Sequence, residues 1–200
     1  MFRLAFLAAL VAFMGTVGCD GGDGASSDCP GAACPCTGAT CDCVGAECSL
    51  DCADVNASGD ACSLNCMPGA DCTATCGVDC NVTCAADTSC DVQVGLGNDV
   101  DCMADAMCAV TGGAESDLDC TESQCEFVAA RDSDVDCDSS ECTVTVGPAS
   151  TVNCTDMSTC DVTCEGSCSV SCDNGSTCTI QCPNDAEPRA FSDAAECADG

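Results

Sequence analysis

The stretch CNVTCAADTSCDVQVGLGNDVDCMADAMCAVTG, residues 80–112, decides the fold because its cysteines recur at a fixed interval. Two cysteine series run through the chain, and each advances in steps of 17 or 18 residues. The first series is Cys66, Cys84, Cys102, Cys120, Cys137, Cys154 and Cys172, and the second is Cys72, Cys90, Cys108, Cys125, Cys142, Cys160 and Cys178. So regular a period indicates one structural unit that is repeated by stacking.

Each repeat contains two short segments in which apolar and polar side chains alternate, such as CNVTC (80–84) and CDVQV (90–94). Alternation with period two is typical of β-strands. The segments are separated by stretches such as MPGAD (67–71) and DNGST (173–177), whose residues favour tight turns. The sequence therefore predicts an all-β fold, a disulfide-rich parallel β-solenoid (β-helix) whose two-strand coils span 17–18 residues.

Such coils enclose a thin core, and the cysteines are expected to compensate for it. The inward side chains are mostly Val, and Phe127 is the one aromatic residue within the repeats. Domains with too little apolar burial are usually cross-linked by disulfides. Consecutive pairing predicts the bonds Cys66–Cys72, Cys84–Cys90, Cys102–Cys108, Cys120–Cys125, Cys137–Cys142, Cys154–Cys160 and Cys172–Cys178, with Cys76–Cys80 and Cys164–Cys168 as additional pairs. The alternative is pairing from coil to coil along each series, since neighbouring strands are about 4.8 Å apart.

The N-terminus has the features of an export signal. Arg3 is followed by the apolar run 4–14 and by Gly15-Thr16-Val17-Gly18-Cys19. Small residues before a cysteine resemble the lipobox of bacterial lipoproteins, and the resemblance implies that Cys19 is the lipidated first residue of the mature chain. An ordinary secretory signal is the alternative. Excluding Cys19 from the 29 cysteines leaves 28, an even number that suits disulfides in an exported protein.

The chain divides into five expected segments. Residues 1–18 are the signal peptide, and residues 19–28 are the lipidated cysteine and a flexible tether. Residues 29–62 form a cysteine-rich N-terminal segment or cap, in which Cys-x4-Cys units recur every seven residues. Residues 63–182 form the solenoid, and residues 183–200 form a C-terminal cap or tail, because exposed end strands need protection.

Composition excludes several classes of function. There are 34 acidic residues against three basic ones, which gives a formal net charge of −31 and predicts no binding to nucleic acid. The chain has no His and no Tyr, and its basic residues are Arg3, Arg131 and Arg189. The common general bases are thus largely missing, and we expect no enzymatic activity and no required cofactor.

Two kinds of metal binding are alternatives. Asp99, Asp117 and Asp134 are predicted to stack outward in one column, and Asp101, Asp119 and Asp136 in the next, where Ca²⁺ could relieve the repulsion between their charges. The Cys-x-Cys spacings at residues 34–36 and 41–43 resemble those of metallothioneins, which implies soft-metal binding by thiolates.

In its signal and composition the chain resembles cysteine-rich surface lipoproteins of diderm bacteria. The resemblance implies a lipid-anchored protein of the cell envelope or cell surface, and it carries no known activity. The stiffness of disulfide-linked coils and the repulsive acidic surface lead us to expect a structural or adhesive role, with an unidentified cell-surface or matrix partner. Without the anchor, the protein would be extracellular.

Overall fold

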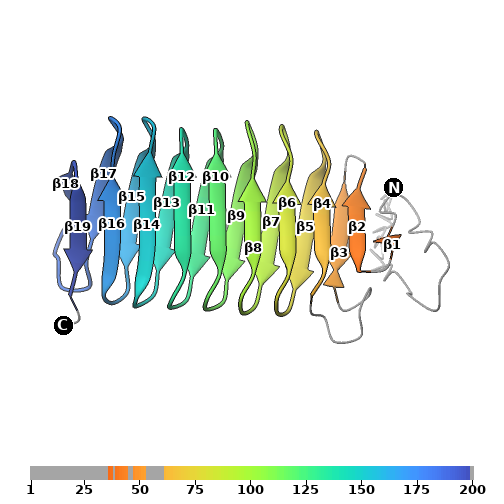
Figure 1. Ribbon diagram of the computed structural model, residues 1–200, viewed down its shortest axis with the longest axis horizontal. Helices are drawn as coiled ribbons and strands as arrows, with labels where there is room; N and C mark the ends of the chain where they lie inside the picture. Colours follow the sequence, from red (N-terminus) through yellow and green to blue (C-terminus); the bar gives the residue numbers. More distant parts are fainter. Residues whose placement is uncertain (1–35, 38, 45–46, 53–60, 199–200) are drawn as a thin grey trace, which may run out of the picture.

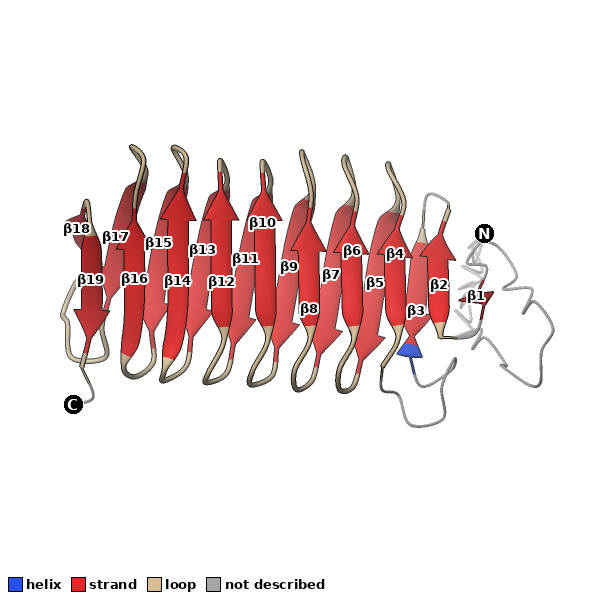
Figure 2. Cartoon of the chain, viewed as in Figure 1, coloured by secondary structure: helices blue, strands red, loops and turns tan. Residues whose placement is uncertain are grey.

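The chain forms two long sheets that face each other. The computed structural model describes residues 36–37, 39–44, 47–52 and 61–198. Its coils are stacked along the long axis, and each coil contributes one strand to each sheet (Figures 1 and 2). In the described part of the chain, no helix is long and apolar enough to cross a membrane.

Between residues 40 and 181 the strands alternate between the two sheets in chain order. The ten-stranded sheet contains β1 (Cys36–Thr37), β2 (Thr40–Cys43), β4 (Ser63–Cys66), β6 (Asn81–Cys84), β8 (Asp99–Cys102), β10 (Asp117–Thr121), β12 (Asp134–Asp138), β14 (Ser150–Thr155), β16 (Cys168–Cys172) and β19 (Ala194–Cys197). The nine-stranded sheet contains β3 (Cys48–Asp51), β5 (Asp71–Cys76), β7 (Ser89–Val94), β9 (Met107–Gly112), β11 (Gln124–Ala129), β13 (Glu141–Val146), β15 (Thr159–Cys164), β17 (Thr177–Gln181) and β18 (Arg189–Phe191).

Neighbouring coils pair in parallel and keep the repeat in register. Cys120 of β10 lies opposite Cys102 of β8 and Cys137 of β12. In the other sheet, Phe127 of β11 lies opposite Val110 and Val144. Identical positions of successive repeats therefore form columns, which confirms the predicted parallel β-solenoid and its 17–18-residue period.

The core is a narrow layer of apolar side chains between the sheets. One column of fully buried side chains comprises Leu64, Val82, Val100, Leu118, Val135, Val152 and Val170, and the facing column comprises Ala74, Val92, Val110, Phe127, Val144, Val162 and Ile180. From β2 to β17, alternate residues are exposed or partly exposed, as in the buried and exposed pattern of β5. The alternation in the sequence thus corresponds to an inner and an outer face.

Buried hydroxyl and amide side chains form two further columns that the sequence pattern did not predict. At one edge of the coils, the backbone N–H of Ser123 donates to Oγ of Ser140, and that of Ser140 donates to Oγ of Ser158, both over 3.1 Å. At the opposite edge, Ser133 N–H donates to Oγ of Ser150 over 3.1 Å, and Cys80 N–H donates to Oδ1 of Asn98 over 2.8 Å. These bonds satisfy backbone groups where the chain turns from one sheet to the other.

The stacked coils begin earlier than residue 63, the start expected from the sequence. β2 pairs in parallel with β4, and β3 pairs in parallel with β5, so residues 40–51 already belong to the stack. Cys43 lies opposite Cys66 and Cys48 lies opposite Cys72, which places the Cys-x4-Cys unit 43–48 in the two cysteine columns. Residues 53–60 separate this coil from the next and obscure the repeat in the sequence.

The C-terminal end is covered by two short strands that reverse direction. β18 pairs with β17 and β19 pairs with β16, and both pairings are antiparallel. A disulfide joins Cys182 to Cys197 across this pair of strands. We call residues 182–198 the C-terminal cap, because the strands end the parallel stacking in both sheets.

Candidate functional site

A set of six aspartates lies on the outer face of the ten-stranded sheet. Asp117 lies opposite Asp99 and Asp134, and Asp119 lies opposite Asp101 and Asp136. All six side chains point outward because the intervening residues, Val100, Leu118 and Val135, are buried in the core. The structure therefore brings together the six predicted residues in two adjacent columns over β8, β10 and β12, which we call the aspartate array.

Uncharged residues border the aspartate array at both ends. Asn81 and Thr83 of β6 lie opposite Asp99 and Asp101, while Thr151 and Asn153 of β14 lie opposite Asp134 and Asp136. Nδ2 of Asn153 donates to Asp136 over 2.7 Å. The array is thus confined to three successive coils.

No basic side chain in the described part of the chain neutralises the array. Arg131 forms an ion pair with Asp132 at 3.6 Å, and Arg189 forms one with Asp185 at 3.8 Å. Both acidic partners lie outside the array. The six carboxylates consequently face one another and solvent.

Partial burial and mutual repulsion raise the pKa of three of these carboxyls. Loss of hydration raises the pKa of Asp101, and the charge of Asp99 adds to the effect. The same loss of hydration raises the pKa of Asp117 and of Asp119, to which the charges of Asp134 and Asp136, respectively, make the next contribution. Each of these carboxyls therefore binds its proton more tightly in the fold than an ordinary Asp carboxyl, whose pKa is 3.8.

A shallow hollow of about 470 Å³ lies along one column of the array. Asp101, Asp119 and Asp136 line it, and Asp138, Thr121 and Thr155 extend it towards the neighbouring turns. Carboxylate and hydroxyl oxygens are ligands suited to hard cations such as Ca²⁺.

The raised pKa values predict that acidification stabilises the fold. Because folding raises the pKa of Asp101, Asp117 and Asp119, their protonation contributes to the free energy of unfolding. This contribution is complete below pH 3.8 and is lost as the pH rises through the raised pKa values. At low ionic strength, the thermal unfolding midpoint should therefore increase between pH 7 and pH 4. A variant with asparagine at the three positions should show a smaller increase, and an equal increase in both proteins would refute the assignment.

The cysteines of the two series are the second group predicted from the sequence. They form disulfides between consecutive cysteines. The structure contains the bonds Cys66–Cys72, Cys84–Cys90, Cys102–Cys108, Cys120–Cys125, Cys137–Cys142, Cys154–Cys160 and Cys172–Cys178. Cys43–Cys48 adds a rung at the N-terminal end. These eight bonds form a continuous disulfide ladder along one edge of the solenoid, and their cysteines are buried.

The opposite edge carries disulfides only near the ends of the described stack. Cys52–Cys62 and Cys76–Cys80 lie towards the N-terminus, and Cys164–Cys168 and Cys182–Cys197 lie towards the C-terminus. In the coils between them the column from Cys76 continues with Val94, and the column from Cys80 continues with Asn98. Hydrogen bonds of buried Asn and Ser side chains thus occupy the middle of this edge.

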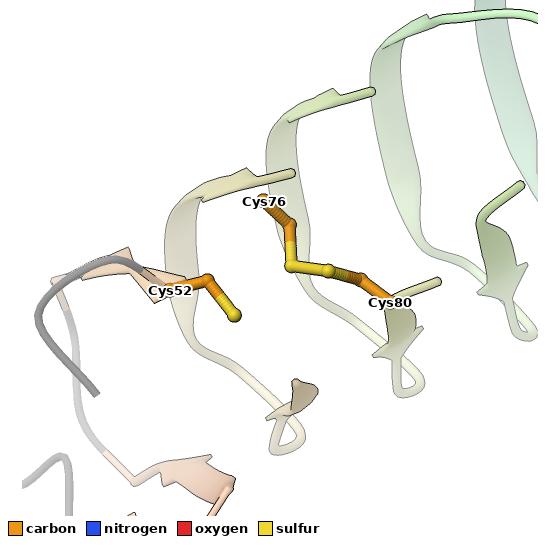
Figure 3. A group of neighbouring side chains, drawn as sticks. All are labelled: Cys52, Cys76 and Cys80. Carbon is orange, nitrogen blue, oxygen red and sulfur yellow. A yellow bond between two sulfur atoms is a disulfide. The ribbon is translucent and has the colours of Figure 1, made fainter. Parts of the chain in front are cut away.

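Sulfur atoms of neighbouring disulfides lie close together, and such a cluster could bind a soft metal if its cysteines were thiolates. Cys52 lies beside the Cys76–Cys80 disulfide, and the three sulfurs are within 4.8 Å of one another (Figure 3). Thiolates are the ligands of soft metals, whereas these sulfurs are bound in disulfides, as are Cys41 and Cys43 of the Cys-x-Cys motif at 41–43. Cys34 of the other motif lies outside the described residues, as do Cys19 and the tether.

Comparison with known proteins gives no match: no family model, no curated protein and no solved structure is similar to this chain.

Proposed function

We propose that the protein is a lipid-anchored structural or adhesive element of the cell envelope. The observation that carries the proposal is the disulfide ladder, which closes coil after coil with buried bonds. Such bonds persist in oxidising compartments outside the cytoplasm. A rod braced in this way resists unfolding and proteolysis, and it has an acidic surface that keeps neighbouring molecules apart.

The proposed anchor is a lipid on Cys19. In a bacterial host with lipoprotein processing, the wild-type chain should incorporate a labelled fatty acid and remain with membranes. Replacing Cys19 with serine should abolish the label and release the chain, while Cys197→Ser should retain it. Equal labelling of C19S and wild-type protein would contradict the anchor.

A second candidate function, binding of Ca²⁺, is favoured by the aspartate array. Six carboxylates lie in register without a basic partner, and a divalent cation would offset the repulsion between them. Titration calorimetry should then show saturable Ca²⁺ binding that is lost when Asp101, Asp119 and Asp136 are replaced by asparagine. A matched variant with asparagine at Asp87, Asp105 and Asp173, outside the array, should bind as the wild type does. Absence of binding at millimolar Ca²⁺ would refute this second function while leaving the structural role untouched.

A further inference from the structure

The disulfide of the C-terminal cap differs from the others in its exposure. Among the cysteines whose side chains the structure describes, Cys182 alone is not fully buried, and it packs at the margin of the core. The ladder cysteines and Cys197 are at most 6% exposed. A thiolate in solvent can therefore reach Cys182 without prior opening of a coil.

The sulfur of Cys182 also has a positively charged neighbour. Nη2 of Arg189 donates to Sγ of Cys182 over 3.7 Å and to the carbonyl oxygen of Glu196 over 3.3 Å. Arg189 is one of two basic residues beyond Arg3 in a chain with 34 acidic residues. Asp185 forms an ion pair with this guanidinium at 3.8 Å and accepts the backbone N–H of Cys182 over 3.3 Å, so it offsets part of the positive charge. Nη2 nevertheless contacts the sulfur directly, and a guanidinium in that position stabilises a thiolate.

The bond between Cys182 and Cys197 holds the cap on the end of the solenoid. It joins the chain just after β17 to the last residue of β19, and Cys197 lies opposite Cys168 of β16. The other contacts of the cap are the antiparallel pairings of β18 and β19, a hydrogen bond from Cys172 N–H to the carbonyl oxygen of Asp193, and the partly buried side chains of Phe191 and Ala195. The two strands have only three and four residues, and most of their side chains are exposed. Opening this bond would leave little to keep β18 and β19 on the edges of β17 and β16.

We propose that Cys182–Cys197 is a thiol-reactive switch that releases the C-terminal cap. The thiolate of a low-molecular-weight thiol attacks Sγ of Cys182 and forms a mixed disulfide, and the Cys182–Cys197 bond breaks with its electron pair on Sγ of Cys197, which takes a proton from water. A second thiolate attacks the sulfur of the small thiol in the mixed disulfide. This attack forms the oxidised small-molecule disulfide and leaves the Cys182 thiolate beside Arg189. Two small thiols are oxidised and one protein disulfide is reduced.

Brief reduction of the folded, oxidised protein tests the proposal. The protein is treated with reduced glutathione at pH 8, free thiols are trapped with N-ethylmaleimide, and peptides cleaved at acidic residues are analysed by mass spectrometry. Cys182 and Cys197 should be labelled first, about tenfold faster than any ladder pair, and glutathione should be found on Cys182. Hydrogen exchange at the amides of β16 and β17 should increase in the same sample, because the cap no longer covers them.

Variants of Arg189 and Arg131 distinguish an effect of the Arg189 charge on the rate of thiol exchange from a general loosening of the cap. Arg189→Gln should slow the labelling of Cys182 by about threefold to tenfold, whereas Arg189→Lys keeps the charge and should react at nearly the wild-type rate. Arg131→Gln, which removes the other basic residue beyond Arg3, should leave the rate unchanged. A different pair opening first, an unchanged or faster rate in R189Q, or unaltered exchange in β16 and β17 would each overturn the proposal.

Discussion

Replacing Gly113 with alanine is expected to disrupt the stacking of coils around β9. A Cβ atom at this position would lie 2.0 Å from the carbonyl oxygen of Gly95 in the preceding coil and 2.5 Å from its carbonyl carbon. The same oxygen accepts the N–H of Gly113 over 2.7 Å, so the two coils cannot separate without loss of this hydrogen bond. Because a backbone atom, rather than a mobile side chain, occupies the space, we expect a loss of about 3 kcal/mol in the free energy of unfolding.

Gly69→Ala is the matched control for this steric effect. A Cβ atom at Gly69 would meet no atom within 4 Å, but the residue has φ of +79°, which disfavours side chains. The control should lose only about 1 kcal/mol, the cost of the left-handed conformation. Chemical denaturation followed by circular dichroism measures both variants, and similar losses in the two would contradict the close approach of the coils at Gly113.

Replacing Phe127 with alanine is expected to produce a loss of similar or greater size in the middle of the core. Phe127 is 0% exposed and is the largest fully buried side chain among the residues that the structure describes. Its ring lies beside Gly112, where an added Cβ would be 3.3 Å from Cε2 and Cζ. Removal of a buried aromatic ring costs about 3–5 kcal/mol, and a core formed by only one layer of side chains from each sheet cannot easily close the cavity.

Val128→Ala provides the control in the same strand. Val128 is the next residue along β11, and its side chain is 43% exposed on the outer face. Its replacement should change the free energy of unfolding by no more than about 0.5 kcal/mol. Equal losses for Phe127→Ala and Val128→Ala would show that the alternation of inner and outer faces is wrong at this coil.

The coil architecture could be predicted from the sequence because each of its determinants recurs at fixed positions. Strands such as residues 99–102 and 134–138 follow from alternating side chains between cysteines, and the aspartate columns follow from the repeat alone. The buried Ser column at Ser123, Ser140 and Ser158 had a usable signal, since each serine precedes a cysteine of the second series by two residues. The prevalence of Ser in turns concealed its burial.

Other features could not be predicted because they depend on contacts outside the repeat. The chain in the C-terminal cap reverses direction, so the antiparallel pairing of β18 and β19 leaves no periodic trace in the sequence. The contact between Arg189 and Cys182 exists only because the cap folds back on the last coil. At the N-terminal end, residues 53–60 interrupt the period and obscure the coil that contains β2 and β3.

Disulfides in this solenoid replace most of the stabilisation that a larger apolar core would provide. The most direct measurement is the far-ultraviolet circular dichroism spectrum of the protein after complete reduction, recorded in the presence of reductant and without denaturant. We predict that the strand signal of the oxidised protein is lost on reduction, since each coil then retains only a few buried apolar side chains against the conformational entropy of about 18 residues. An unchanged strand spectrum in the fully reduced protein would contradict this claim.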